Sequence, residues 1–365
     1  MIRMVNNNFR PCLSPWIGAL ACSLSIPHFV PAQETDKGAP FPEADDSGYT
    51  FLVGGHTYGI PGGGADNGIY PPFLNTLQKR EGDLFMVLTG DIVQKSIPAS
   101  WDAVLAQLQP SLPPAYFVMG NHDASEYATE LFTEKFGGDY YSFDVHTERF
   151  IVLNAQHSPK SVHGEQTAFL RGKLEDSPGI RNFFIFTHEV LWKQHARYGR
   201  VTINSNANVE NYNFWVDLFP LLKLQPRKGI YWIAGDVGVP WADPAAYDQL
   251  GNIHLIASGM GGNKEENFLE IQVQDGDVRI QAIPLGSGKI SREIAWYSVG
   301  NMVNWKPQAP SGQPQGKAAW RLDNPGQKLK RLLQDKKFYI GFIFALFLVF
   351  VYQASQAYWK NNQSS

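Results

Sequence analysis

Short, almost uninterrupted apolar segments alternate with helix-like stretches along the middle of the chain, and this alternation most restricts its fold. The segments expected to be strands are residues 49–53, 84–88, 116–119, 150–153, 183–186, 230–233, 253–257 and 268–273. The segments expected to be helices are residues 101–109, 126–136, 166–175 and 214–222. Strands that are buried on both faces read as continuous apolar runs, so the pattern predicts an α/β protein with helices covering the sheet.

Polar residues directly follow several of the expected strands. The groups are Gly54-Gly55-His56, Gly90-Asp91, Gly120-Asn121-His122-Asp123, Thr187-His188-Glu189 and Gly235-Asp236-Val237-Gly238. In an α/β sheet the carboxyl ends of the strands border the ligand crevice, so these side chains are expected to lie close together. A single His after a strand is usually an ordinary hydrogen-bonded residue. Repetition of Asp, Asn and His at strand ends instead indicates a site for Mn, Fe or Zn rather than for copper–thiolate chemistry.

The series resembles the calcineurin-like metallophosphoesterases, whose motifs run D-x-H, G-D, G-N-H-D/E, a single His and G-H-x-H. Its most specific element is Gly120-Asn121-His122-Asp123, and the stretch 164–170 is similar to the helix that the family has between its third and fourth motifs. The resemblance covers nearly all of the globular part, predicted to be a domain over residues 33–305. It implies a β-sandwich flanked by helices, with two metals held at the strand ends.

Two glycines and an aspartate depart from the family pattern. Gly54 stands where the family has the Asp of its first motif, and Asp236 and Gly238 stand where it has the two His of its last motif. The resemblance therefore implies that one metal keeps only His56 and Asp91 as ligands. The other metal keeps a complete set of donors, namely Asp91, Asn121, His188 and Asp236. We expect one firmly bound divalent cation, Mn, Fe or Zn, because a carboxylate oxygen can replace imidazole as a ligand.

The function expected from this resemblance is metal-dependent hydrolysis of a phosphomonoester or phosphodiester. His122 would be the general acid for the leaving group, and Asp123 would orient it. The alternative is a catalytically weak or inactive scaffold or binding module in the cell envelope, which the glycines at positions 54 and 238 favour. The surviving donor set and His122 favour the enzyme.

Charge and cysteine content exclude other classes. The chain carries 31 Lys and Arg against 34 Asp and Glu, for a net charge of −3, so no nucleic-acid partner is expected. Its 2 cysteines, Cys12 and Cys22, both lie close to the N-terminus. A disulfide scaffold and a cysteine-based zinc site are therefore excluded for the globular part.

Residues 1–32 have the layout of a secretory signal. Arg3 and Arg10 precede the largely apolar stretch 12–26, and small residues lead to a cleavage position after Ala32. An uncleaved anchor or a disordered tail is the alternative. The signal predicts that the globular domain lies outside the cytoplasm, in a periplasmic or extracellular compartment.

The C-terminal part resembles a tether. Residues 306–337 read as a Pro- and Gln-rich linker followed by a basic lead-in, and residues 338–359 are uncharged and long enough to cross a bilayer. We therefore predict a C-terminal transmembrane helix. The basic stretch 317–337 would by itself favour a cytoplasmic location for its side of the membrane. The export signal instead predicts that this side lies outside the cytoplasm. We give it precedence because the first such segment of a chain usually sets the orientation.

Reporter fusions test this topology. Alkaline phosphatase inserted within residues 306–316 should be active, and green fluorescent protein at the same position should be dark, because the export signal carries that segment across the membrane. The same fusions on a chain without residues 1–32 are the control and should stay cytoplasmic. A cytoplasmic readout from the intact chain would show that the basic stretch sets the orientation.

Overall fold

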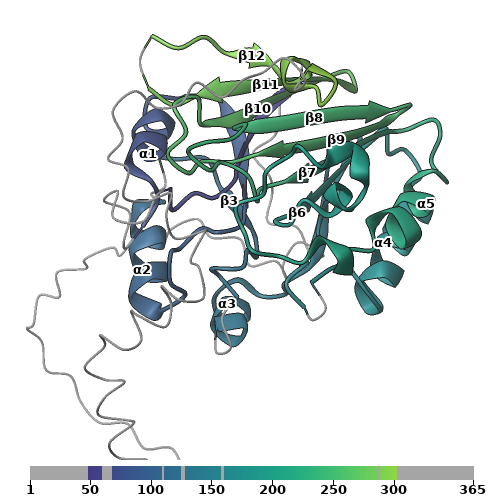
Figure 1. Cartoon of the computed structure of the whole chain (residues 1–365), viewed down its shortest axis with the longest axis horizontal. Coiled ribbons are helices and arrows are strands. Elements are labelled where there is room, and N and C mark those ends of the chain that lie inside the picture. Colours follow the sequence, from purple (N-terminus) through teal and green to yellow (C-terminus); the bar gives the residue numbers. More distant parts are fainter. Residues whose placement is uncertain are drawn as a thin grey trace, which may run out of the picture. The chain divides into compact units, whose positions relative to one another are not determined.

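Two mixed β-sheets form the centre of the fold (Figure 1). The computed structural model describes residues 48–59, 68–108, 111–124, 128–157, 160–286 and 288–301. The strands of the first sheet are β1 (Tyr49–Gly54), β2 (Asp83–Thr89), β3 (Ala115–Val118), β10 (Asn267–Gln274), β11 (Asp277–Pro284) and β12 (Arg292–Glu293). Those of the second are β4 (Tyr141–Val145), β5 (Glu148–Val152), β6 (Asn182–Thr187), β7 (Gly229–Ala234), β8 (Ala245–Leu250) and β9 (Ile253–Ser258).

Parallel pairing brings strand ends together along one edge of each sheet. The first sheet has the order β12-β11-β10-β1-β2-β3, in which β1, β2 and β3 run parallel. The second has the order β4-β5-β6-β7-β9-β8, in which β5, β6, β7 and β9 run parallel. The residues that follow β1, β2 and β3 therefore share an edge, as do those that follow β6 and β7.

Aromatic side chains fill the space between the sheets. Phe51 of β1 stacks on Phe85 of β2, with ring centroids 5.0 Å apart. Phe51 also meets Phe150 of β5 and Phe184 of β6 edge-on, at 5.2 Å and 5.0 Å. These rings come from both sheets and are completely buried, so the sheets pack face to face through them.

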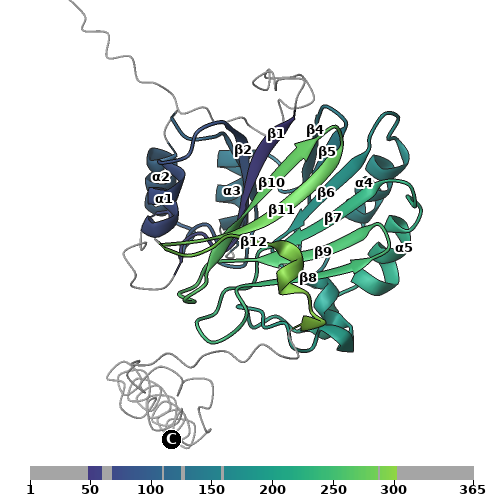
Figure 2. The same cartoon turned by 90° about the horizontal axis from the view of Figure 1, so that it is seen from above.

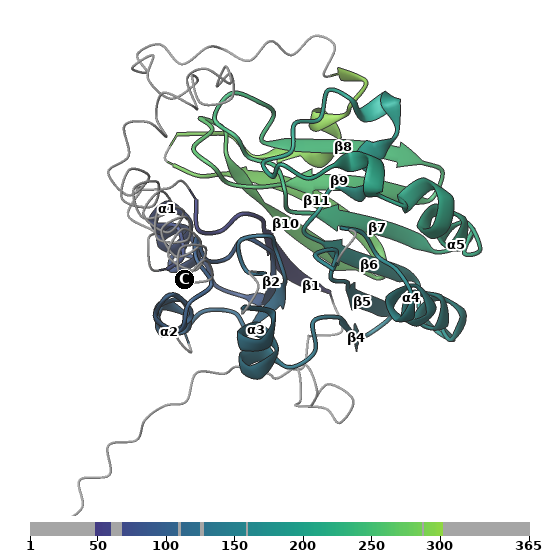
Figure 3. The same ribbon diagram turned by 60° about the horizontal axis from the view of Figure 1, so that its bottom comes forward.

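Helices cover the outer face of each sheet (Figures 2 and 3). On the first sheet they are α1 (Pro71–Leu77), α2 (Pro98–Gln107) and α3 (Ala128–Phe136). On the second they are α4 (Glu165–Glu175), α5 (Phe219–Leu222), the 3₁₀ turn η2 (Leu191–Gln194) and the π-helical turn η5 (Phe214–Leu218). The predicted α/β arrangement of a β-sandwich flanked by helices is thus found.

Each strand and helix expected from the sequence is present, but several further elements were missed. The strand β4 has a mixed buried and exposed pattern, and β8 and β11 carry polar residues at several positions. Such strands lack the continuous apolar run on which the expectation depended. The helix α1 is only 7 residues long and begins with two prolines, so it offers little helical periodicity.

No helix among the described residues is long and apolar enough to span a membrane. The predicted signal (1–32), the linker and lead-in (306–337) and the predicted transmembrane helix (338–359) all lie outside the described residues. Their assignments therefore remain predictions.

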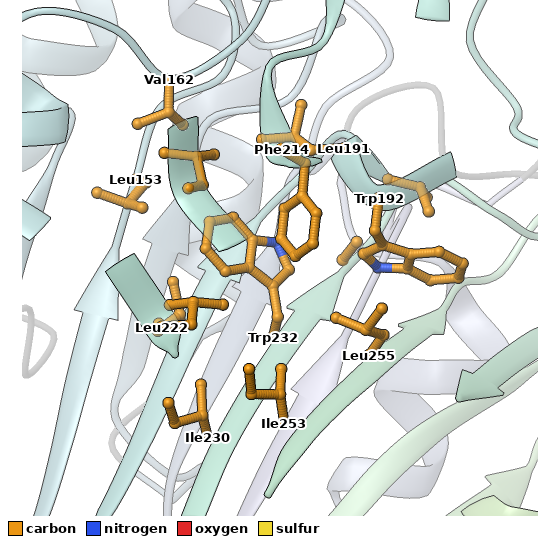
Figure 4. Close-up of a cluster of buried hydrophobic side chains, with 14 of the residues drawn as sticks. Leu153, Val162, Leu191, Trp192, Phe214, Leu222, Ile230, Trp232, Ile253 and Leu255 are labelled. Atoms are coloured by element: carbon orange, nitrogen blue, oxygen red, sulfur yellow. The ribbon is translucent and has the colours of Figure 1, made fainter. Parts of the chain in front are cut away.

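The outer core of the second sheet is built around Trp232 of β7 (Figure 4). Its ring meets Phe214 of η5 edge-on, with centroids 5.0 Å apart, and its indole N–H donates to Thr187 Oγ1 at 3.1 Å. Trp232 is completely buried, so it fastens η5 to the sheet.

Replacement of this ring should destabilise the domain. Trp232→Ala should lower the free energy of unfolding by about 3–5 kcal/mol, because it removes a large buried ring and leaves a cavity. Urea denaturation monitored by circular dichroism measures the change. Trp296→Ala is the matched control, since Trp296 is 56% exposed and should cost less than about 1 kcal/mol. Equal costs for the two variants would contradict the packing role of Trp232.

Candidate functional site

The residues predicted as metal ligands converge where β1, β2, β3, β6 and β7 end. His188 lies at the centre. Its Nε2 is 3.2 Å from Asn121 Oδ1, 3.4 Å from Asp91 Oδ1 and 3.8 Å from Asp236 Oδ1. His56 Nε2 lies on the other side of Asp91, 3.6 Å from its Oδ2. The structure therefore brings together every ligand position that the sequence predicted.

A backbone contact aims the His188 ring at these oxygens. Its Nδ1 lies 2.8 Å from the carbonyl of Thr89, so that Nδ1 carries the hydrogen and Nε2 faces the carboxylates. Burial opposes the charged imidazolium, but the charges of Asp91 and Asp236 outweigh it and raise the pKa of His188 to about 10. In turn, the charge of His188 overcomes burial and lowers the pKa of Asp91 below its usual range.

Glycines allow the backbones at this edge to approach one another. A Cβ atom at Gly90 would lie 2.5 Å from His188 Nδ1, and one at Gly120 would lie 2.1 Å from the amide nitrogen of Asp91. Asp91 itself has a φ of 52°, in the left-handed region. The tight crossing is therefore specific to these residue types, because any larger residue would push the loops apart.

The structure corrects the role predicted for Asp123. The partner of His122 Nδ1 is the carbonyl of Gln94, at 2.8 Å, and Asp123 is not the group that orients this ring. The buried carboxylate of Asp123 instead accepts hydrogen bonds from backbone amides of both loops. The donors are Ile92 N at 3.0 Å, Val93 N at 3.1 Å and Gly120 N at 2.9 Å. Asp123 thus ties the loop after β2 to the loop after β3.

His122 keeps a position suited to a proton donor. Its backbone amide donates to Asp91 Oδ1 at 2.9 Å, and its Nε2 lies 3.3 Å from the hydroxyl of Tyr58. The side chain is only partly buried. Tyr58 also packs against His56, with ring centroids 4.3 Å apart. The sequence analysis did not identify Tyr58, since no motif includes it.

Neighbouring groups restrict a side chain at the positions of the two missing ligands. A Cβ atom at Gly54 would lie 3.0 Å from the ring of Phe73, which packs where a side chain would project. Gly238 has a φ of 105°, and a Cβ atom there would lie 2.6 Å from the carbonyl oxygen of Met260. The loss of the Asp and the His is therefore accommodated by the surrounding structure.

A loop that the sequence analysis missed reaches into the site. The side-chain amide of Asn204 donates to His56 Nε2. Next along the chain, Ser205 donates to both oxygens of Asp236, from its amide to Oδ1 at 2.8 Å and from its hydroxyl to Oδ2 at 2.6 Å. No motif or strand end marks this loop in the sequence, so only its path in the fold shows that it belongs to the site.

A second buried carboxylate supports the loop. Glu189 follows His188 directly and is completely buried. Its oxygens accept from Lys160 Nζ at 3.0 Å and from the hydroxyl of Tyr212 at 2.6 Å, and one of them lies 3.3 Å from the hydroxyl oxygen of Ser205. Burial opposes ionisation, but His188 and Lys160 lower the pKa of Glu189. A charged Glu189 therefore joins the loop to the strand end that carries His188.

These residues do not fit a two-metal centre. Among the described residues, no group of three or more His, Cys, Asp or Glu side chains is arranged to hold a metal ion. At the first metal position, for which only His56 and Asp91 remain as ligands, the family's other donors are replaced by Gly54 and Gly238. There His56 Nε2 already accepts a hydrogen bond from Asn204. At the second, the donor types are suitable for Mn, Fe or Zn. Two of the oxygens there, however, already accept hydrogen bonds from Ser205.

Comparison with known proteins agrees with the motifs. A sequence profile described as calcineurin-like phosphoesterase matches residues 56–240. The chain belongs to this family. No characterised protein sequence matches the chain significantly.

Two solved structures similar to this calcineurin-like phosphoesterase cover most of its described part. GAP50, the anchor in the inner membrane complex of Plasmodium, is 14% identical, with 68% of this chain and 89% of that chain covered and a TM-score of 0.47. Vacuolar protein sorting 29 from Cryptosporidium parvum is 12% identical, with 68% and 98% covered and a TM-score of 0.35. The family assignment itself rests on the profile match and the motifs.

Removal of the Asp123 carboxylate should unfold the site and destabilise the domain. Asp123→Ala leaves three buried backbone amides without an acceptor and should cost more than about 3 kcal/mol. Guanidinium denaturation measures the loss. Asp102→Ala is the control, because the side chain of Asp102 is 65% exposed and only pairs with Lys135, so it should cost less than about 1 kcal/mol. A cost for Asp123→Ala as small as that of the control would contradict the tying role.

Proposed function

We propose that this chain is a catalytically silent member of the calcineurin-like phosphoesterase family that works as a binding module. The observation that carries the proposal is the loss of donors at the first metal position, where Gly54 and Gly238 stand. A Cβ atom at Gly238 would lie 2.6 Å from the carbonyl oxygen of Met260, so a ligand there would require the loop to be rebuilt, whereas a side chain at Gly54 would require the Phe73 ring to shift.

Without the first metal position, the site lacks one half of a two-metal mechanism. A pair of metals holds the attacking and leaving oxygens of a displacement in line, and a single metal gives up that symmetric clamp. In this chain the imidazole of His56 faces the Asn204 amide rather than a free coordination position. Burial lowers the pKa of His56 to about 4, so the ring is neutral at neutral pH and serves as a hydrogen-bond acceptor for that amide.

A second candidate is slow hydrolysis of a phosphomonoester or phosphodiester at one metal. The convergence of Asn121, Asp91 and Asp236 on His188 Nε2 favours it. Mn, Fe or Zn bound there would polarise a phosphoryl oxygen and lower the pKa of a bound water. His122, held by the Gln94 carbonyl, would then donate a proton to the leaving oxygen.

Tethering is the second part of the proposal. The signal-like segment 1–32 and the apolar segment 338–359 support a domain that is held at a membrane surface outside the cytoplasm. A tethered fold without turnover is suited to binding a partner at that surface. The near balance of acidic and basic residues favours a partner other than nucleic acid.

A comparison of turnover separates the two candidates. The purified chain, with Mn²⁺, Fe²⁺ or Zn²⁺ supplied in turn, should hydrolyse glycerol 2-phosphate and glycerophosphocholine, whose alkoxide leaving groups need a proton donor, no faster than its His122→Ala variant does. The reason is that the clamp for the attacking oxygen is missing. A wild-type rate above that of the variant by the factor of about 10²–10⁴ typical of a general acid would contradict the silent assignment and establish the single-metal enzyme.

A further inference from the structure

The loop of residues 201–213 takes the place of ligands in the site. It follows the turns after η2 and ends just before η5. Within it, Asn204 and Ser205 together contact the two site residues that lie on opposite sides of Asp91 and His188, namely His56 and Asp236. One short loop thus links the end of β1 to the end of β7.

In the contact between Asn204 and His56, the amide is the hydrogen-bond donor and the imidazole nitrogen is the acceptor. An amide N–H can only donate, so its hydrogen bond to His56 Nε2 requires the lone pair that a metal would otherwise use. The backbone amide of Asn204 in turn donates to the carbonyl of Asp236 at 3.1 Å, which holds the residue in place. The side chain is therefore directed at His56 by its own backbone.

Ser205 likewise donates hydrogen bonds to Asp236. It supplies one donor to each carboxylate oxygen, and its hydroxyl lies between Asp236 and Glu189. Tyr212, at the far end of the loop, donates to Glu189 at 2.6 Å. The loop is consequently hydrogen-bonded at both ends to buried carboxyl groups of the site, whose oxygens would be costly to leave without partners in this region.

We propose that Asn204 and Ser205 form an intramolecular plug across the centre, in which Asn204 occupies the donor atom of His56 at the first metal position and Ser205 occupies the carboxylate of Asp236 at the second. This inference rests on the silent function proposed above and gives its cause within the fold. The plug supplies hydrogen-bond donors where a cation would supply positive charge. The site is thereby stable without a metal, and it gains one when the donors are removed.

Variants of the plug test the proposal through metal affinity. Asn204→Asp is nearly isosteric and exchanges the donor for a carboxylate beside His56 and Asp91. It should tighten Mn²⁺ binding, measured by isothermal titration calorimetry on the full chain in detergent, by at least about tenfold, the scale on which single groups around a metal site act. Asn204→Ala, which only removes the donor, should tighten binding by less.

The matched control is Asn208→Ala. Asn208 lies on the same loop, and its side chain caps the amide of Glu210 at 3.2 Å without reaching the site. Its Mn²⁺ affinity should equal that of the wild type. Asn204→Asp adds a ligand of its own, so the decisive comparison is with the variant that only removes the donor. If Asn204→Ala binds Mn²⁺ no more tightly than Asn208→Ala, the plug is overturned.

A measurement on the wild type keeps the test independent of folding. Nuclear magnetic resonance should show a nitrogen–nitrogen coupling across the hydrogen bond from Asn204 to His56 Nε2, and its absence would overturn the plug whatever the variants do. Hydrolysis is judged separately by the comparison with His122→Ala. Turnover by the wild type would end the silent assignment, whereas an unchanged affinity in Asn204→Ala would end the plug alone.

Discussion

The aromatic packing between the two sheets is the interaction on which the rest of the structure depends. Phe51 and Phe85 of the first sheet interlock with Phe150 and Phe184 of the second, all of them completely buried. Face-to-face packing of this kind fixes the position of one sheet on the other. The parallel strands of each sheet then end near one another, and residues more than a hundred positions apart in the chain become neighbours in a single site.

Because the strand ends converge, several carboxyl groups are buried close together, and donors from this chain stabilise them. Asp91, Asp236 and Glu189 lie in one buried region, where like charges destabilise each other. In the family this charge is balanced by metals. Here His188, Lys160 and the hydroxyl and amide groups of the loop 201–213 supply the balance. Loss of two ligands is thus matched by a gain of hydrogen bonds, and the fold is retained.

Much of the fold could be predicted from the sequence, because buried strands such as β6 contain a continuous apolar run, here residues 183–186, that is visible without the structure. Strands with mixed patterns, such as β4, could not, since their burial depends on neighbours that are distant in the chain. The motif residues lie close together, as expected from their positions at strand ends, and Asn121 contacts His188. The orienting role predicted for Asp123 was wrong, because an aspartate beside a histidine gives no sign that its carboxylate turns toward backbone amides.

By itself the sequence determined the layout of this protein: alternating apolar strands and helices, polar residues at the strand ends, and glycine at positions 54 and 238. These are local properties, written in residue type and spacing. Only the tertiary structure decided what fills the altered site. The ring of Phe73 and the amide of Asn204 come from segments with no motif, and a contact between distant segments is set by how the sheets and loops pack. Packing, not spacing, determines which donor meets His56.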